Sequence, residues 1–261
     1  MEIVFAGAGR LATQFAKALH RQGHTIAAVY SRTMASAEAL CAMVGGLPTD
    51  DIGQLPLKAD AFILAVKDSA LPSLIPLLAK GREEQPMFHT AGSVPMAVFG
   101  QLPHHGVIYP MQTFSKERDV DFAHLPVFIE AGSDLSLSRA EELATAVTDR
   151  VYRLSSDERR YLHLAAVFAC NFANHCYTLA ADILEKHGMA FDVMLPLIAE
   201  TAQKVNELHP RQAQTGPAVR FDENVINAQT ALLADNPLMQ EVYTLMSRSI
   251  HHYSEKTLDA A

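Results

Sequence analysis

Short apolar runs alternate with helical patterns along the first 154 residues. The run AFILAV at residues 61–66 is continuously apolar, which is typical of a central strand in a parallel sheet. Strands are predicted at residues 1–5, 25–30, 46–48, 61–66, 87–89, 107–109, 127–130 and 151–154, with helices at 13–22, 35–44, 69–78 and 136–148. This alternation predicts a doubly wound, mostly parallel α/β sheet.

The hydrophobic pattern changes near Ser155. Beyond it no strand is predicted, and helices are expected at residues 158–186, 191–208, 225–235 and 237–257, with an irregular loop at 209–224. Gly188 is expected to cap the end of the first of these helices. The sequence therefore predicts an α/β domain over residues 1–154 and an all-helical domain over residues 155–261, packed tightly with a cleft between them.

A turn of the pattern Gly-x-Gly-x-x-Ala follows the first strand. Gly7 permits the tight turn, Gly9 lets the backbone approach a pyrophosphate, and Ala12 keeps the next helix packed on the sheet. The N–H groups at the start of that helix favour a bound anion. We therefore expect a dinucleotide to bind a Rossmann-like domain here, the alternative being such a domain without a cofactor. The expected contacts are Gly7, Gly9, Arg10 and Leu11.

The end of the second strand indicates which dinucleotide to expect. Enzymes that prefer NAD usually place Asp or Glu there to bind the ribose 2′-hydroxyl. Here the strand is followed by Ser31, Arg32 and Thr33, a cation and two hydroxyls that suit a 2′-phosphate. The sequence thus predicts NADP rather than NAD, the alternative for Arg32 being a solvated surface side chain.

Two later strand ends supply further candidate cofactor contacts. Ala65, Val66 and Lys67 follow the fourth strand, where the ribose and nicotinamide of a cofactor would pass. The alternative for Lys67 is an exposed loop lysine. Thr90 follows the fifth strand and offers a hydroxyl beside glycine-containing loop residues. We expect these residues to line the cofactor site.

Two further segments are expected near the same sheet edge. His89 is a candidate proton donor, but a lone histidine at a strand end is more often structural. Residues 109–114 (YPMQTF) are expected to shape the wall of the cleft.

The long helix at the start of the helical domain carries a polar stripe. At 100° per residue the stripe falls on about a third of the circumference; its members are His163, Asn171, Asn174, His175 and Thr178. The rest of the helix is apolar, so we expect it to be buried and its polar groups to need partners. Asn171 is the best candidate for orienting a substrate, and His163 a candidate proton relay. The alternatives are polar links to neighbouring helices or a dimer interface.

Composition narrows the function further. A net charge of −8 argues against general binding of nucleic acid or an anionic membrane, and no apolar stretch is long enough to span a bilayer. The 12 histidines lack metal-site spacing, so no metal is expected. With no secretory signal expected and no disulfide framework among three cysteines, we expect buried free thiols and a cytoplasmic protein.

With these residues placed, the chain resembles pyrroline-5-carboxylate reductase relatives in the 6-phosphogluconate-dehydrogenase-like superfamily. It looks most like a narrower group in which a Rossmann-like domain is fused to an uncharacterised helical domain, often labelled putative NADP oxidoreductase. The segments that carry this resemblance are residues 89–93 (HTAGS), 109–114 (YPMQTF), 163–171 and 215–217 (TGP). The resemblance implies NADP binding and a homodimer formed through the helical domain.

Two departures from the relatives concern the substrate. The Gly-Ser-Gly-Pro-Ala segment of pyrroline-5-carboxylate reductases has only a late counterpart, at residues 215–218, which disfavours proline synthesis. Relatives acting on β-hydroxyacids place a lysine one turn before the helix asparagine, where this chain has Val167. A protonated imine needs less acid help than a ketone.

The prediction is therefore an NADP-dependent oxidoreductase that transfers hydride between NADP(H) and a small imine or carbonyl substrate in the cleft. The alternatives are a reductase of a flavin-like deazaflavin carrier and a non-catalytic NADP-binding sensor or scaffold.

Overall fold

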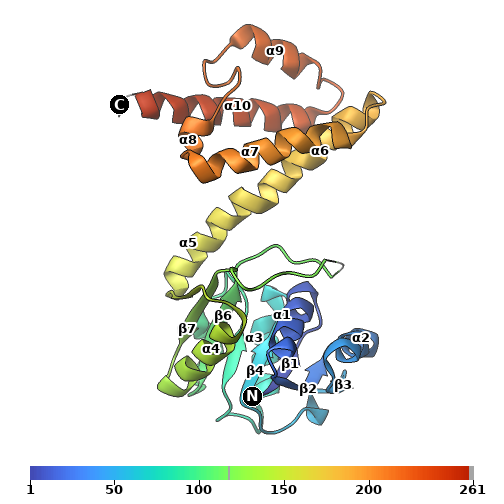
Figure 1. Cartoon of the computed structure of the whole chain (residues 1–261), viewed down its shortest axis with the longest axis vertical. Coiled ribbons are helices and arrows are strands. Elements are labelled where there is room, and N and C mark those ends of the chain that lie inside the picture. Colours follow the sequence, from blue (N-terminus) through green and yellow to red (C-terminus); the bar gives the residue numbers. More distant parts are fainter. Residues whose placement is uncertain (117, 259–261) are drawn as a thin grey trace. The chain divides into compact units, whose positions relative to one another are not determined.

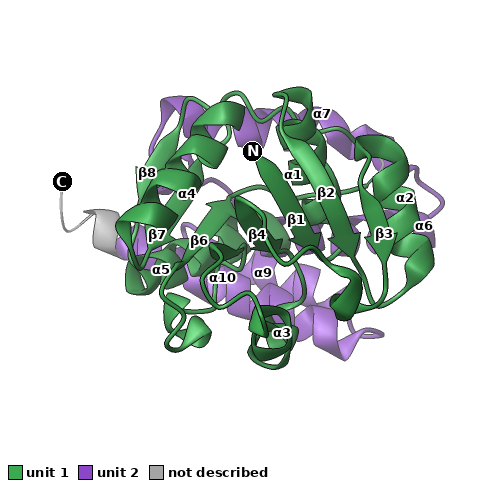
Figure 2. Ribbon diagram, turned by 90° about the horizontal axis from the view of Figure 1, so that it is seen from below, with its two compact units in different colours: residues 1–171 green, residues 172–261 purple. Residues whose placement is uncertain are grey.

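The computed structural model describes residues 1–116 and 118–258, with side chains described as far as Glu255. The chain divides into two compact units, Met1–Asn171 and Phe172–Ala261, which we call the sheet unit and the helical unit (Figure 2). The compact units divide after Asn171, so the helix that begins just after residue 154 is part of the sheet unit. The domain boundary at residue 154 stays a prediction.

The sheet unit alternates strands and helices as the sequence predicts (Figure 1). Its elements are β1 (Glu2–Ala6), α1 (Arg10–Arg21), β2 (Thr25–Tyr30), α2 (Met34–Val44), β3 (Leu47–Thr49), β4 (Ala61–Leu64), α3 (Leu71–Ala79), β5 (Met87–His89), β6 (His105–Pro110), β7 (Val127–Ala131), α4 (Asp134–Val147), β8 (Val151–Arg153) and α5 (Ser156–Ala166). The first helix begins at Arg10 rather than at residue 13, because the turn leads directly into it.

The strands form one eight-stranded sheet in the order β3-β2-β1-β4-β5-β6-β7-β8. Neighbouring strands are parallel except β6 and β7, which pair antiparallel. The doubly wound, mostly parallel sheet is thus confirmed. The order reverses direction at β1, and the carboxyl ends beside such a reversal are where open α/β sheets bind ligands.

Side chains alternate between the two faces of the sheet. In β1, Ile3 and Phe5 pack with residues of α1, α2 and α4, whereas Val4 and Ala6 pack with residues of α3. Figure 2 shows α1, α2 and α4 over one face and α3 over the other. Because both faces are covered, the central strands consist of continuous apolar runs.

The helical unit contains α6 (Ala173–Lys186), α7 (Leu195–Glu207), α8 (Pro210–Ala213), α9 (Glu223–Ala231) and α10 (Pro237–Leu258). Gly188 follows α6 with a φ of 70°, as expected of a helix-ending glycine. The loop predicted at residues 209–224 contains the short helix α8, so that prediction is wrong at this point; Pro210 at the first helical position and the His209 ring, which accepts from the Arg211 N–H, start the turn.

The long helix predicted at residues 158–186 is present but is not one regular α-helix. α5 and α6 are joined by a π-helical segment, Val167–Phe172. The prediction that this helix is buried is wrong for the single chain: of its described residues only Arg159 and Leu184 are buried. An apolar composition indicates that a helix is stabilised by packing against another apolar surface, but it does not indicate whether that surface is in the same chain.

Cysteine burial also differs from expectation. Cys41 is buried, but Cys170 and Cys176 are exposed, since both lie on this uncovered helix.

Candidate functional site

The glycine turn after β1 has the conformation that the motif predicts. Gly7 has a φ of 115°, and a Cβ there would lie 2.2 Å from the carbonyl oxygen of Ala65. Gly9, the residue before α1, has open space where a Cβ would be, and no side chain caps the helix N–H groups. Gly7 is therefore required by the fold, whereas Gly9 leaves room for a ligand at the start of a helix.

A pocket of about 940 Å³ opens at this turn within the sheet unit. It is lined by every residue that the sequence predicts for the cofactor: Gly7, Gly9, Arg10, Leu11, Ser31, Arg32, Thr33, Ala65, Val66, Lys67 and Thr90. These residues follow the carboxyl ends of four parallel strands, β1, β2, β4 and β5. Their roles stay predictions, but the structure brings them together around one space of the size that suits a cofactor.

The pocket lining is rich in cations. Arg10, Arg32, Lys67 and Lys116 lie along it, with Asp68 as the acidic residue among the described lining residues. Such a balance suits a ligand with several phosphate groups.

Lys116 reaches the pocket because its loop is fastened to α1. The Gln14 side chain is buried and donates hydrogen bonds to the carbonyl oxygens of Ser115 (2.9 Å) and Arg118 (3.0 Å). Asp119 adds ion pairs with Lys17 and Arg21 of the same helix.

Tyr109 and His163 form a polar pair in the same pocket. The Tyr109 hydroxyl lies 3.0 Å from Nδ1 of His163, joining the end of β6 to α5. A Cβ at Gly92 would lie 2.5 Å from His163 Nδ1 and 2.9 Å from Tyr109 Cζ, so glycine provides the space for the pair. Burial raises the pKa of the Tyr109 hydroxyl, which stays protonated at neutral pH.

His89 is fully buried below this pocket rather than along it. Its Nδ1 accepts a hydrogen bond from the Ala91 N–H (3.1 Å), and its ring stacks on Phe99 at 5.6 Å. Burial, followed by the charge of Arg159, lowers the pKa of His89 to about 3. His89 thus stays neutral and stabilises the loop that follows it, which favours a structural role over that of a proton donor.

The sequence predicted Tyr109 only as part of the cleft wall and missed Lys116. The pairing of Tyr109 with His163 could have been considered, because Tyr109 lies near the end of the strand beside β5, whose loop is a predicted site segment. Lys116 could not be predicted, because its position depends on contacts with Gln14, which lies 101 residues before Ser115.

His163 lines the pocket, but Asn171 does not. Asn171 is an exposed residue of the π-helical segment, and its role in substrate orientation stays a prediction. Within the described residues, no cluster of three or more His, Cys, Asp or Glu side chains is placed to hold a metal ion. A search of those same residues finds no helix with the length and hydropathy to cross a membrane.

Comparison with known proteins adds two family matches. Residues 1–113 match the model of the Rossmann-like domain, and residues 125–250 match that of a domain of unknown function (DUF2520). No curated protein shows significant similarity to the chain.

Solved structures resemble the whole chain. A Bacteroides fragilis protein named "putative NADP oxidoreductase" is 53% identical, with 96% of this chain and 98% of that one covered and a TM-score of 0.93. An imine reductase of Myxococcus stipitatus, solved with NADP+, is 15% identical over 100% of this chain and 95% of that one (TM-score 0.67). A reductive aminase of Aspergillus terreus, solved with NADPH and ethyl-5-oxohexanoate, is 15% identical over 100% and 94% (TM-score 0.64).

The two distant structures show the fold, a Rossmann-like sheet followed by helices of the 6-phosphogluconate-dehydrogenase-like type. The Bacteroides protein is similar enough, over enough of both chains, to show the family. The chain therefore belongs to the family of oxidoreductases in which a Rossmann-like domain is joined to a DUF2520 domain.

Proposed function

We propose that this protein is an NADPH-dependent reductase of small imines, with carbonyl compounds as the second substrate class. The observation that carries the proposal is the Tyr109–His163 pair, which places a proton donor in the same pocket as the glycine turn and its cations. The related oxidoreductase is named for NADP, and two proteins of the same fold are an imine reductase and a reductive aminase.

The pocket residues fit NADP(H). The open space at Gly9 admits a pyrophosphate, and Arg10 lies beside it. Ser31, Arg32 and Thr33 would bind the 2′-phosphate. When bound, NADPH supplies the hydride that forms the new C–H bond.

Tyr109 would complete the reduction by supplying the proton. In the tautomer with a hydrogen on Nδ1, His163 donates to the Tyr109 oxygen and leaves the hydroxyl hydrogen free for the substrate nitrogen. As the C=N bond is reduced, its electron pair moves to nitrogen, which takes the Tyr109 proton. The product is an amine, and His163 stabilises the tyrosinate until solvent reprotonates it. Burial raises the pKa of Tyr109 above the ordinary ~10, while a hydrogen bond from His163 favours the tyrosinate, so the proton passes to the basic amine nitrogen.

Calorimetric titration with NADPH and NADH tests the cofactor assignment. Arg32→Ala should weaken NADPH binding about tenfold or more and leave NADH binding nearly unchanged, because only NADPH carries the 2′-phosphate. Lys58→Ala, an exposed lysine outside the pocket, is the control. Failure of the native protein to bind either nucleotide would overturn the proposal.

Turnover of a cyclic imine, 2-methyl-1-pyrroline, tests the chemistry. Tyr109→Phe should reduce kcat about 100-fold while NADPH binding is retained. Unchanged turnover in this variant would exclude Tyr109 as the donor. NADPH binding with no turnover of imines, ketones or a deazaflavin would favour a sensor.

We also propose that two copies pair through the helical unit. Leu197 and Leu232 of this unit are largely exposed, which is unusual for residues of this size gathered in one small unit. Sedimentation velocity should show a dimer that Leu232→Asp dissociates. Leu57→Asp, at an equally apolar exposed position of the sheet unit, should leave the dimer intact; dissociation by both, or by neither, would contradict the proposed interface.

A further inference from the structure

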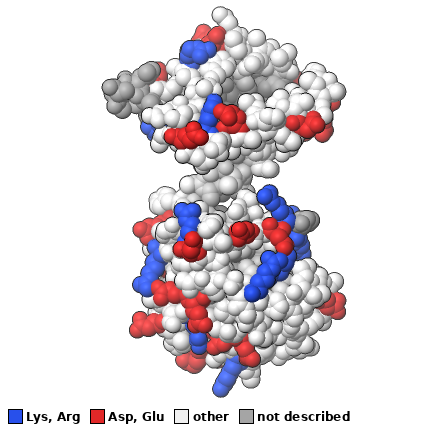
Figure 3. Space-filling model, in the orientation of Figure 1, with Lys and Arg blue, Asp and Glu red and all other residues white. Residues whose placement is uncertain are grey.

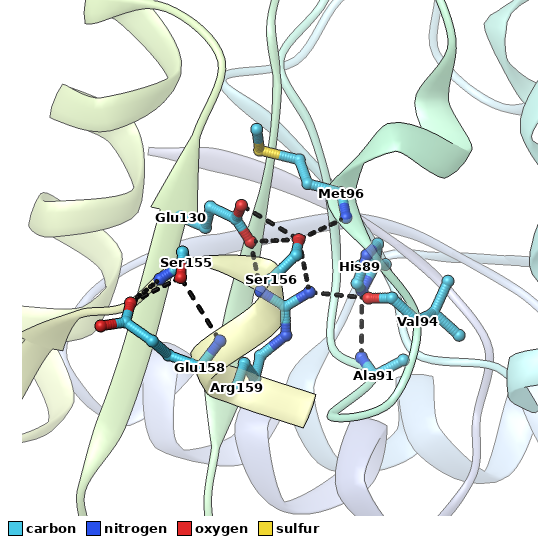
Figure 4. A network of polar contacts seen from close by, with 9 residues as sticks. All are labelled: His89, Ala91, Val94, Met96, Glu130, Ser155, Ser156, Glu158 and Arg159. Atoms are coloured by element: carbon cyan, nitrogen blue, oxygen red, sulfur yellow. Dashed lines mark hydrogen bonds and ion pairs between the residues drawn. The ribbon is translucent and has the colours of Figure 1, made fainter. Parts of the chain in front are cut away.

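A buried ion pair lies under the proposed site without lining it. The Arg159 side chain is 1% exposed and pairs with Glu130, which is 17% exposed. The same guanidinium donates to the carbonyl oxygen of Val94 (2.6 Å) and to the Ser156 hydroxyl (3.3 Å) (Figure 4). Taking such charges out of water is costly unless the geometry is good and the remaining groups are hydrogen-bonded.

The network joins three segments that are distant in sequence. Arg159 and Ser156 belong to α5, Glu130 to β7, and Val94 to the loop after β5. The Ser156 hydroxyl donates to Glu130 (2.7 Å) and accepts from the Met96 N–H (2.8 Å), which fastens the far side of that loop (Figure 4). The start of α5 is thus fixed to both the sheet and the loop.

What the network holds in place is the Tyr109–His163 pair. His163 follows Arg159 by four residues, so the two side chains lie on the same face of α5, one turn apart. The loop that Arg159 and Ser156 fasten also contains Gly92, against which His163 packs. A shift of α5 or of this loop would therefore separate His163 from Tyr109 or close the space at Gly92.

We propose that Glu130 and Arg159 are positioning residues for proton delivery: through α5 and the loop after β5 they hold His163 against the Tyr109 hydroxyl. The proposal rests on the function proposed for Tyr109. Neither residue lines the pocket, so their effect is exerted through His163 and through their own charges.

Charges around Tyr109 make the two residues distinguishable. Burial raises the pKa of Tyr109; Arg159 opposes this by lowering it, and Asp68 and Cys170 raise it further, while His163 faces the hydroxyl from α5. Glu130→Gln leaves the Arg159 charge uncompensated and should lower this pKa. Arg159→Gln removes the cation and leaves Glu130, and should raise it. Displacement of His163 alone would instead move this pKa in the same direction in both variants, so the titration reports the charges of the pair and turnover reports the positioning.

The test is an ultraviolet titration of tyrosinate in the full-length protein, with Tyr109→Phe subtracted to isolate Tyr109. We expect Glu130→Gln to lower and Arg159→Gln to raise the pKa of Tyr109, with Arg159→Lys close to the native protein. The exposed pair Arg153–Glu141 supplies the matched control, since Arg153→Gln and Glu141→Gln should not move the titration. NADPH affinity, measured in parallel, identifies any variant that fails to fold.

Turnover of 2-methyl-1-pyrroline provides the second readout. Glu130→Gln should lower kcat about tenfold with KM nearly unchanged, and Arg159→Lys should retain more activity than Arg159→Gln. If Arg159→Gln fails to fold, Glu130→Gln and Arg159→Lys still decide the outcome. Native kcat in a Glu130→Gln variant that still binds NADPH would overturn the positioning role. Full activity in Tyr109→Phe would instead overturn the assignment of Tyr109 as the proton donor. The failure of the positioning role and the failure of the donor assignment therefore give different results.

Discussion

The sheet unit and the helical unit use their apolar residues in opposite ways. In the sheet unit Phe5, Phe62 and Leu143 are fully buried between helices and strands. In the helical unit Leu232 is 78% exposed, and the buried hydrophobic side chains among its described residues are Leu184, Ala218, Ile226 and Met239. Figure 3 shows charged side chains on the visible faces of both units, with wide uncharged areas between them.

The difference shows that one unit closes its own core and the other does not. A two-faced parallel sheet covers its strands with the helices that connect them. A set of helices with few internal contacts leaves apolar surface for another surface to cover, which is why its stability should depend on protein concentration. The following changes test this contrast.

The largest effect is expected from a backbone clash inside the sheet unit. Gly7→Ala should lower the free energy of unfolding by about 4 kcal/mol at any protein concentration, because its Cβ would overlap the Ala65 carbonyl and its φ is positive. Gly9→Ala is the control: its Cβ meets open space, so stability should be kept while NADPH binding weakens. Urea unfolding and calorimetry measure the two quantities, and an equally stable Gly7→Ala would contradict the clash.

A matched pair of leucines sharpens the contrast directly. Leu143→Ala in the sheet unit should cost about 3 kcal/mol at all concentrations, because the side chain is fully buried. Leu232→Ala should cost less than about 0.5 kcal/mol in dilute protein and more when the protein is concentrated. Urea unfolding at two protein concentrations gives both values. If the change in unfolding free energy caused by Leu232→Ala were the same at both protein concentrations, the contrast between the two units would be contradicted.

Acid should weaken the sheet unit through His89. Its pKa in the folded protein, about 3, lies below the ordinary value of 6.5, so the unfolded chain binds the extra proton and stability falls as pH drops through this window. Between pH 7 and 5 the loss should be about 2 kcal/mol. His89→Gln keeps an acceptor for the Ala91 N–H but does not titrate, so its stability should change less over the same range. Equal pH slopes for the two proteins would show that His89 is not the sensitive group.

The smallest effect concerns the start of α5. Ser155 caps this helix, accepting from the Glu158 N–H while the Glu158 carboxylate accepts from the Ser155 N–H. Ser155→Ala should cost about 1 kcal/mol. Ser138→Ala, an exposed position within α4, should be neutral in the same thermal unfolding experiment. Native stability in Ser155→Ala would show that the cap contributes nothing.

Much of the sheet unit could be predicted because its signals are local. The continuous apolar run at β4, the glycine turn before α1 and the cation after β2 each lie within a few residues of the structure they specify. The same reasoning failed for the burial of α5 and α6, because a sequence pattern does not identify the surface that covers an apolar helix.

The candidate site divides in the same way. Arg32 and Lys67 were found because they follow strands, and the carboxyl ends of parallel strands share one sheet edge. Lys116, Arg159 and Glu130 were missed, because their positions depend on contacts between segments far apart in the chain.

The close fit of His163 against Gly92 has a consequence for redesign of this enzyme. A mutant library built to accept bulkier substrates should leave residue 92 unchanged, since any added side chain would collide with the imidazole before it met a new substrate. Diversity is better introduced at Gln112, an exposed residue of the same pocket whose side chain accepts a hydrogen bond only from the neighbouring Thr113 N–H and hydroxyl among the contacts described.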